Sequence, residues 1–336
     1  MIDLSIIIVN YKSSHHVMNC LHSIYESRMN ISHEIIIVDN ASNDSSRYEI
    51  CSLYKELIWI QSEYNAGFAR ANNMGIKASR GRNILLLNAD TIITNNAIEL
   101  TLIKFENDKQ YAACGVQLLN TDSSKQQSGA RFVVGGINNF LALPYLGNAI
   151  KKLGYNFGMK QHNVVDMQQD MQVDWIVGAF IMTRRTIVEK SGLLDEDFFM
   201  YAEEIEWCSR IRKNGPLILY HSPKVTHIGG GTSSKFYKKE SNENFSDLFD
   251  RKGKQIILSQ LLRIRKQYGV VWYFIHLLVY IFEIVLFGAC MIIENAIRIN
   301  NRKFGYSEWK GYTRNILGIS HFFPAISINK HIFYKA

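Results

Sequence analysis

The amino-acid sequence predicts an α/β fold with a mainly parallel, mixed sheet flanked by helices, followed by a helical C-terminal extension. In the first half of the chain, short apolar runs rich in β-branched residues alternate with segments of helical periodicity. This alternation is typical of βαβ units. Hydrophobic residues make up 47% of the 336 residues and charged residues 20%, so we expect a packed core rather than disorder.

The first apolar run is too short and too β-branched for a signal peptide, and we expect it to form a buried strand that opens the fold. Three further runs have the same character, and helical patterns fill the gaps between them. The expected strands are Leu4–Val9, Glu34–Val38, Leu57–Gln61 and Ile84–Leu87. The expected helices are His15–Arg28, Ser45–Tyr54 and Gly67–Ala78.

The middle of the chain has a weaker pattern. Residues 120–170 are rich in Asn, Gln, Gly and Ser, and their weak periodicity predicts a long loop region or lid. A second structured block is expected from Asp174 to about Ser233.

The cysteines and the charge indicate the compartment and the partners. The five cysteines are scattered and form no CxxC pair, which suits free thiols in a reducing cytoplasm and argues against a zinc site. The net charge is +8, and much of the excess flanks a late apolar stretch. This placement favours an anionic membrane surface over a nucleic acid. The flanking basic residues are Arg251, Lys252, Lys254, Arg263, Arg265, Lys266, Arg298, Arg302, Lys303, Lys310 and Arg314.

The apolar stretch, residues 269–293, is long enough to span a bilayer. At helical spacing its polar residues fall on one narrow stripe. Because both flanks are basic, a single span would oppose the positive-inside tendency. An in-plane helix or a re-entrant hairpin satisfies both observations, and the alternative is a helix buried against the rest of the protein. The stripe consists of His276, Tyr280, Glu283, Cys290 and Glu294.

Polar residues follow three of the predicted strands, and ligands of open α/β sheets bind beyond the carboxyl ends of strands. The first strand is followed by Asn10 and Tyr11, the second by Asp39, and the fourth by Asn88 and Asp90. A carboxylate in this position suits Mg²⁺ or Mn²⁺ bridging phosphate oxygens, although each aspartate could instead cap a helix. The chain lacks GxGxxG after the first strand and lacks GxxxxGK[ST], which disfavours dinucleotide oxidoreductases and P-loop NTPases.

The second block holds an acidic cluster at the start of a predicted helix, formed by Glu203, Glu204 and Glu206. The helix dipole favours acidic residues there, but such carboxylates can also supply a general base. Further on, His227 precedes three glycines and the basic residues Lys235, Lys238 and Lys239. A lone histidine is more often structural, yet this setting makes it a candidate metal or phosphate contact.

Taken together, these segments resemble the family-2 inverting glycosyltransferases, particularly the bacterial rhamnosyltransferase-like branch. The matching segments occur in the family's order over residues 4–233: SIIIVNYKS, EIIIVDNAS, NAGFARANNMGI, LLLNADT, DWIVGAFIMTRR, LDEDFFMYAEEIEWCSRIRKNG and HIGGGTS. The resemblance implies a GT-A fold, Rossmann-like, over residues 1–240. Within it, residues 1–118 would form the nucleotide-binding half and 119–240 the acceptor and catalytic half. The apolar stretch and its basic flanks, which lie beyond the resemblance, predict a helical, membrane-associating region over 241–336.

The resemblance also implies roles for individual residues. Glu204 would be the general base, and Asp39 would accept a hydrogen bond from the uracil or thymine ring. Asp90 and His227 would hold Mg²⁺ or Mn²⁺, and Trp175 and Glu203 would contact the acceptor. The implied donor-binding residues are Asn10, Tyr11, Asp39, Asn65, Asn72, Asn88, Asp90 and Gly178.

Two positions depart from the family pattern. The first residue of its DXD element is here Asn88, which leaves one carboxylate, and its Glu-Asp pair is here Glu203-Glu204. The longer Glu204 could still act as the base, although positioning matters at this scale.

The implied activity is transfer of a sugar, with rhamnose as the first expectation, from a dTDP- or UDP-sugar to a saccharide acceptor. The basic, apolar tail suggests that the acceptor is polyprenyl-diphosphate-linked, for surface polysaccharide synthesis. The enzyme would then be cytoplasmic and peripheral on the inner face of the cell membrane. One alternative is a nucleotidyltransferase, but NYKSSHH after the first strand fits its glycine-rich basic loop poorly. A catalytically silent binding subunit is the other alternative, and the presence of Asp39, Asp90 and Glu204 argues against it.

Overall fold

The structure is a computed structural model that describes residues 2–156, 163–229, 248–297 and 304–336. The chain divides into two compact units. The first, which we call the sheet unit, comprises Met1–Arg131, His162–Glu196 and Glu203–Lys238. The second, which we call the helical unit, comprises Phe132–Gln161, Asp197–Ala202 and Lys239–Ala336. The predicted division at residue 240 stays a prediction, and the helical unit also takes two segments from earlier in the chain.

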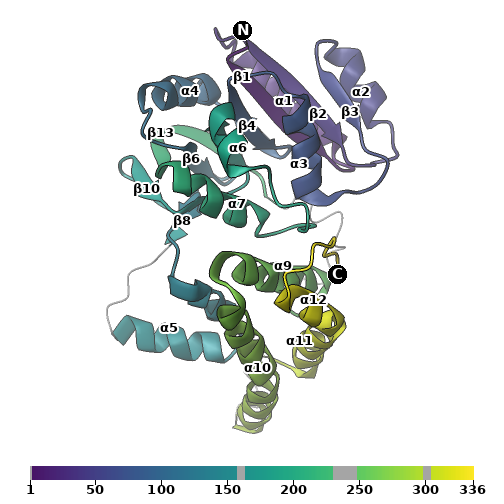
Figure 1. Ribbon diagram of the computed structural model, residues 1–336, viewed down its shortest axis with the longest axis vertical. Coiled ribbons are helices and arrows are strands. Elements are labelled where there is room, and N and C mark those ends of the chain that lie inside the picture. The colour runs from purple at the N-terminus through teal and green to yellow at the C-terminus, as the bar shows by residue number, and fades with distance from the viewer. Residues whose placement is uncertain (1, 157–162, 230–247, 298–303) are drawn as a thin grey trace. The chain divides into compact units, whose positions relative to one another are not determined.

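A large mixed sheet forms the centre of the sheet unit, with helices flanking it (Figure 1). Its strand order is β10-β13-β6-β12-β4-β1-β2-β3, with β5 paired to β13 and β7 to β6. The strands are β1 (Leu4–Asn10), β2 (His33–Asp39), β3 (Ile58–Gln61), β4 (Asn83–Asn88), β5 (Thr91–Ile93), β6 (Ala113–Leu119), β7 (Lys125–Gln126), β10 (Met171–Val173), β12 (Phe180–Arg184) and β13 (Leu217–His227). A smaller sheet contains β8 (Gly129–Ala130), β9 (Asn163–Val164) and β11 (Trp175–Ile176).

The helices of this unit pack on apolar strands. Strand β1 lies between β2 and β4, parallel to both, and its isoleucines are buried because helices cover both faces of such a strand. A side-chain carbon added at Gly75 would lie 2.4 Å from Ile7 Cγ2, so this glycine lets α3 pack closely on β1. The helices are α1 (Ser14–Glu26), α2 (Ser46–Leu53), α3 (Gly67–Ala78), α4 (Ala97–Asn107), α6 (Arg185–Ser191) and α7 (Glu203–Ile211). The predicted α/β fold class is therefore confirmed, including all four early strands and the three helices between them.

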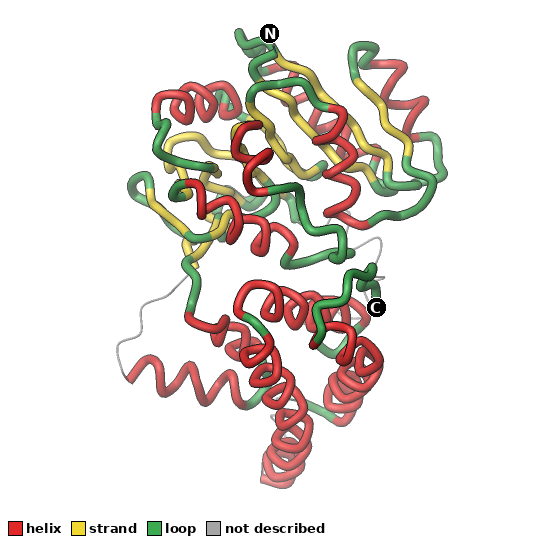
Figure 2. The backbone as a smooth tube through the Cα atoms, in the orientation of Figure 1, coloured by secondary structure: helices red, strands yellow, loops and turns green. Residues whose placement is uncertain are grey.

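The helical unit is built almost wholly from helices (Figure 2). It contains a 3₁₀ segment η1 (Val134–Ala142) and the helices α5 (Leu146–Asn156), α9 (Arg251–Tyr268), α10 (Val270–Ile297), α11 (Tyr306–Ile319) and α12 (Phe323–Ser327), with a 3₁₀ turn η3 (Ser320–Phe322) before α12.

The prediction of a long loop over residues 120–170 was wrong. This range contains short strands, η1 and the eleven-residue helix α5. The contacts that hold these elements come from far along the chain. The ring of Phe140 packs on His276, and the Tyr145 N–H donates to a Glu283 carboxylate oxygen at 2.7 Å. A local pattern cannot reveal such partners.

The exposed face of helix α10 is wholly apolar, although several polar residues of this helix are buried. His276, Tyr280 and Glu283 of the predicted stripe are buried, whereas every exposed residue from Val270 to Ile297 is apolar. Inside, His276 Nε2 lies 2.8 Å from the carbonyl oxygen of Gly135. Within the described residues, α10 is the one helix that is long and apolar enough to cross a membrane, by length and composition alone.

Candidate active site

The ends of β1 and β2 hold Asp39 in a fixed orientation. The two strands are in register, so that Asn10 lies opposite Asp39. Asn10 Nδ2 donates to Asp39 Oδ1 at 2.7 Å, while Gln61 Nε2 and the Ser42 N–H donate to Oδ2 at 2.7 and 3.0 Å. Asp39 is only 2% exposed and Asn10 is fully buried, so in this structure Asn10 holds the carboxylate. Tyr11, next in the chain, is half-buried.

The turn into α3 is organised by two asparagines. Asn40 Oδ1 accepts from the Ala66 N–H at 2.7 Å, and Asn40 Nδ2 donates to Asn65 Oδ1 at 3.1 Å. Asn65 Oδ1 also accepts from the N–H of Gly67, whose φ of +75° a side-chain-bearing residue rarely adopts. Asn72 is buried within α3, where its Nδ2 donates to the Phe68 carbonyl. The Asn65 side chain thus stabilises the turn, and the Asn72 side chain bonds to the backbone of its own helix.

The end of β4 meets the end of β13. Antiparallel pairing of β13 with β5 places His227 opposite Thr91, and the Ile228 N–H donates to the Asp90 carbonyl at 2.9 Å. As a result, His227 Nε2 lies 3.3 Å from Asp90 Oδ1 and 3.3 Å from Asn88 Nδ2. The sequence places Asn88 and Asp90 together after one strand and His227 far along the chain, and the sheet brings all three side chains together.

Gln126, a residue that sequence reasoning missed, fixes the orientation of the His227 ring through its Nδ1 atom. His227 Nδ1 lies 2.7 Å from Gln126 Oε1, while Gln126 Nε2 donates to Asn120 Oδ1 at 2.9 Å. With the amide nitrogen used in this way, its oxygen accepts from Nδ1–H. The other ring nitrogen, Nε2, then faces Asp90 and Asn88. A second hydrogen bond of this kind orients most metal-binding histidines.

This cluster is small but has the chemistry for a divalent cation. Within the described ranges, no group of three or more His, Cys, Asp or Glu side chains is placed to hold a metal ion. Mg²⁺ and Mn²⁺ in phosphate sites often use one or two carboxylates and take further oxygens from the substrate. The carboxylate of Asp90, the amide of Asn88 and the Nε2 atom of His227 fit that requirement.

The acidic cluster opens α7, as the sequence predicts, and its members differ in environment. Glu206 forms an ion pair with Arg210 at 2.8 Å. Glu203 is only 3% exposed, and its Oε2 has no hydrogen-bond partner within the described residues. Burial, reinforced by the neighbouring Glu204 carboxylate, raises the pKa of Glu203 well above its usual range. Burial therefore disfavours the ionised form of Glu203, whereas Glu204 is only half-buried.

Gly178 connects the acidic helix to the end of β4. A side-chain carbon added at Gly178 would lie 3.6 Å from Glu204 Cγ. The next residue, Ala179, accepts a hydrogen bond from the Asn88 N–H at 3.0 Å, because β12 runs antiparallel to β4. Gly178 thus lies against Glu204, and its neighbour Ala179 bonds to Asn88. The half-buried Trp175 lies on β11 of the smaller sheet, a few residues before Gly178.

The sequence marks Asn40 with Asp39 at the end of the second predicted strand, and in the structure Asn40 holds the turn into α3. Gln61, which holds the Asp39 carboxylate, was missed from sequence. Its position at the end of a predicted strand is the signal that could have found it, whereas no local signal marks Gln126. The predicted basic contacts Lys235, Lys238 and Lys239 lie outside the described residues.

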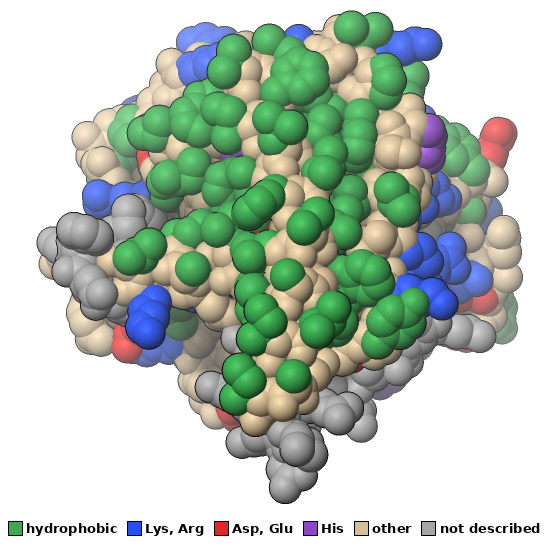
Figure 3. Space-filling view, turned by 90° about the horizontal axis from the view of Figure 1, so that it is seen from below, with side chains coloured by type: hydrophobic (Ala, Val, Ile, Leu, Met, Phe, Trp, Pro, Cys, Tyr) green, Lys and Arg blue, Asp and Glu red, His purple; other side chains and the backbone are tan. Residues whose placement is uncertain are grey.

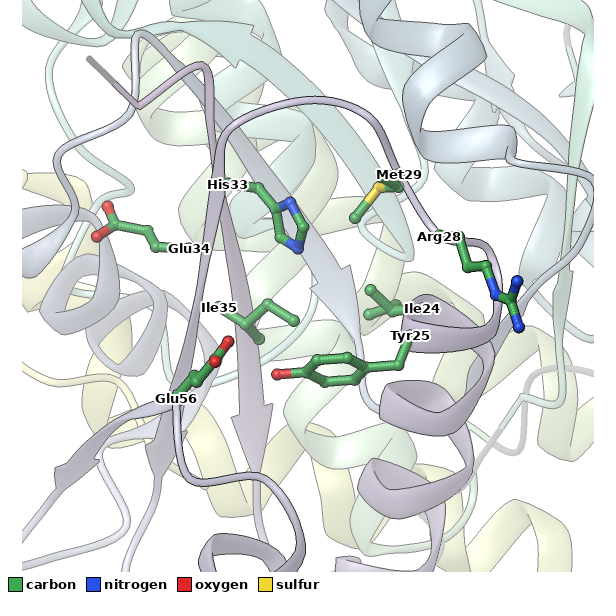
Figure 4. Close-up of a pocket in the computed structure, with 8 residues that line it drawn as sticks. All are labelled: Ile24, Tyr25, Arg28, Met29, His33, Glu34, Ile35 and Glu56. Atoms are coloured by element: carbon green, nitrogen blue, oxygen red, sulfur yellow. The ribbon is translucent and has the colours of Figure 1, made fainter.

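A small pocket lies away from these residues. It has a volume of about 180 Å³ and is lined in part by Tyr25, Arg28 and His33 (Figure 4). His33 begins β2 and Asp39 ends it. The pocket therefore lies at the amino-terminal end of β2, and the predicted site lies at its carboxyl end. It contains none of the predicted site residues.

Comparison with known proteins gives a family match over the first part of the chain. A family model described as Glycosyl transferase family 2 matches residues 5–190, more than half of the chain. A low-salt glycan biosynthesis hexosyltransferase, Agl10 of Haloferax volcanii, is 33% identical over 220 residues, which cover 63% of this chain and 62% of Agl10. Rhamnosyltransferase WbbL of Escherichia coli is 25% identical over 238 residues, 68% of this chain and 84% of WbbL.

Two further similarities agree with this match. The O-antigen chain rhamnosyltransferase WbaN of Salmonella anatum is 29% identical over 212 residues, which cover 60% of each chain. This chain thus matches less than two thirds of the length of Agl10 and of WbaN. Among solved structures, GalNAc-T7 with UDP, GalNAc and Mn²⁺ superimposes with a TM-score of 0.50 at 15% identity, over 68% of this chain and 43% of that one. At this identity the similarity shows a shared GT-A-like fold.

Proposed function

This chain belongs to glycosyltransferase family 2, in its rhamnosyltransferase-like branch, and from that premise we propose that it moves a sugar, rhamnose first, from a nucleotide diphosphate to a saccharide acceptor with inversion. The observation that carries the proposal is the convergence of Asn88, Asp90 and His227 where β4, β5 and β13 meet. Gly178 and Glu204 lie beside the same strand end.

The donor would bind along the carboxyl edge of the sheet. The fixed Asp39 carboxylate is a hydrogen-bond acceptor for the ring N–H of a uracil or thymine base, with Tyr11 beside it. Asn65 at the start of α3 would contact the nucleotide-sugar, and the diphosphate would reach Asp90 and His227. The parallel arrangement of β1, β2 and β4 supports this path, because it brings these residues to one edge.

Asp90 and His227 would hold Mg²⁺ or Mn²⁺, with Asn88 adjacent. When bound, such a cation supplies positive charge that stabilises the departing diphosphate. The Gln126 amide keeps the proton on His227 Nδ1 and so leaves Nε2 free for this role.

Glu204 would act as the general base. It would take the proton from an acceptor hydroxyl, whose oxygen forms a bond to the anomeric carbon while the bond to the diphosphate oxygen breaks on the opposite face. The electron pair of that bond leaves with the nucleotide diphosphate, and the anomeric configuration inverts. The burial of Glu203 supports this assignment, because a protonated carboxyl is a poor base. Trp175 and Glu203 would border the acceptor.

We propose further that the helical unit binds an anionic membrane from the cytoplasmic side, near a polyprenyl-diphosphate-linked acceptor. In water, an amphipathic helix buries apolar residues and exposes polar ones. The exposed residues of α10 are all apolar, and it buries His276 and Glu283. Buried polar stripes with apolar outer faces are typical of helices in lipid. Hydrophobic side chains gather on one face of the molecule, with Lys and Arg side chains at its margin (Figure 3), and such margins favour anionic headgroups.

The activity is tested by incubating the full chain with Mn²⁺ and a panel of dTDP- and UDP-sugars and measuring release of nucleotide diphosphate. A saccharide on a polyprenyl diphosphate serves as the acceptor. We expect dTDP-rhamnose to give the highest rate and the product to have the inverted anomeric configuration. Turnover of no nucleotide-sugar, with the protein folded, would contradict the proposal.

A further inference from the structure

The segment Asp197–Ala202 leads directly into Glu203 and Glu204, and we call it the strap. It belongs to the helical unit, although the helix that follows it belongs to the sheet unit. Its last two residues, Tyr201 and Ala202, have φ values of 72° and 67°. Two successive residues with side chains adopt this left-handed conformation only where their surroundings hold them there.

The beginning of the strap is held by a buried ion pair. Lys266 Nζ of α9 lies 2.7 Å from Asp197 Oδ2, and the two side chains are only 7% and 8% exposed. His331 Nδ1 lies 3.0 Å from the same oxygen, and the Asp197 carbonyl accepts from the Tyr334 N–H at 2.8 Å. Removal of one member of a buried ion pair leaves an uncompensated charge, so this attachment depends on both partners.

The middle of the strap is held by α9 and by the last residues of the chain. Phe198 and Phe199 are fully buried, and the Phe199 ring packs edge-on against Phe333 with 5.6 Å between ring centroids. Ser259 Oγ of α9 donates to the Met200 carbonyl at 2.7 Å. The strap is therefore attached to the helical unit along its length.

Helix α7 is anchored differently at its two ends. Toward its C-terminal end, Trp207 Nε1 donates to the Gly192 carbonyl at 2.9 Å, and Arg210 Nη1 donates to the Ser191 carbonyl at 2.6 Å. At its first residue, Glu203 Oε2 has no hydrogen-bond partner within the described residues. The backbone that enters this end comes from the strap.

We infer that α9 and the C-terminal residues 330–336 position the catalytic base, with Lys266 and Ser259 acting on Glu204 through the strap. This inference rests on the proposed role of Glu204. The helical unit then contributes to turnover as well as to membrane attachment, and its loss would disable an enzyme whose donor site is intact.

The test compares the full-length variants K266M, K266R and S259A, with Y145F as the matched control. Y145F removes a hydrogen bond to Glu294 within the same unit, at residues that do not touch the strap. We expect K266M to lower kcat at least about tenfold while the donor Kd changes less than about twofold, because small displacements of a catalytic group cost rate rather than binding. S259A should show a smaller loss of kcat, K266R should restore part of it, and Y145F should match wild type.

Hydrogen exchange gives a second readout that does not depend on activity. In K266M and S259A we expect faster amide exchange in the strap and in the first turn of α7, with β1 and β4 unchanged. If K266M does not fold, S259A carries the test. Wild-type kcat in the folded variants, or faster exchange that stops at Ala202, would overturn the inference. An inactive wild type would instead contradict the proposed function, and exchange would still decide whether the strap controls α7.

Discussion

His227 and Gln126 are 101 residues apart in the chain, yet His227 Nδ1 lies 2.7 Å from Gln126 Oε1. This contact determines which ring nitrogen faces Asp90. The amide thus selects the tautomer that a cation site requires, and its partner Asn120 fixes the amide in turn.

Substitution of Gln126 by Leu should weaken Mn²⁺ binding. Loss of an outer hydrogen bond to a metal-binding histidine typically costs about 10- to 100-fold in affinity, and we expect a loss in that range for Mn²⁺ titrated in the presence of UDP. The matched control is Q172L, which alters an exposed glutamine on β10. Equal Mn²⁺ affinity in Q126L and wild type would remove Gln126 from the site.

Substitution of Asp90 by Ala should abolish transfer and leave the fold intact. The variant loses the carboxylate that would hold the cation against the diphosphate. Product formation is measured with and without excess EDTA, and circular dichroism checks the fold. Full activity in D90A, or in wild type with EDTA, would exclude the metal from the mechanism.

Substitution of Glu204 by Gln should preserve donor binding and lower turnover by about 10²- to 10⁴-fold, the usual contribution of general base catalysis. E203Q replaces a buried carboxyl whose pKa is raised by its burial, and it should have a much smaller effect. The measurements are kcat and donor Kd for both variants. The reverse order of the two kcat values would assign the base to Glu203.

Glu203 should also make stability depend on pH. Its pKa in the folded protein is raised above the ordinary value of 4.5, so the folded state binds more protons than the unfolded state as pH rises above that value. The free energy of unfolding therefore falls with rising pH until the raised pKa is passed. E203Q removes this contribution, and urea unfolding at several pH values above 4.5 should show E203Q gaining stability relative to wild type. Parallel pH profiles would contradict the prediction.

Charge introduced on the outer face of α10 should release the protein from membranes. In L278D and F282D we expect loss of co-flotation with anionic vesicles, because both side chains are exposed on that face. L53D on α2 alters a similarly exposed leucine of the sheet unit and is the matched control.

For wild type, salt should weaken binding without abolishing it, since each basic residue near the surface adds about 1 kcal/mol of screened attraction and apolar burial is not screened. If α10 were ordinary core, wild type would stay out of the lipid fraction, and truncation before Arg251 would unfold the sheet unit.

The sequence alone determined the α/β class and the elements up to β4, because local periodicity reports directly on strand and helix formation. It also marked Asp39, Asp90 and Glu204 as candidate site residues, since polar residues at strand ends and helix starts interrupt an apolar pattern, and their roles stay predictions. The helical spacing of His276 and Glu283 likewise predicts that they share one face of a helix, although it does not predict their hydrogen-bond partners.

Only the tertiary structure decided which of these residues meet. Asn88 and His227 are 139 residues apart, and antiparallel pairing of β13 with β5 brings them within 3.3 Å of each other. Helix α5 lies in a range that the sequence predicts as a loop, and only its distant contacts explain it. The ion pair between Asp197 and Lys266 likewise joins residues far apart in the chain. A local pattern specifies an element and its buried face, whereas partner and register depend on packing between distant segments, on which local periodicity carries no information.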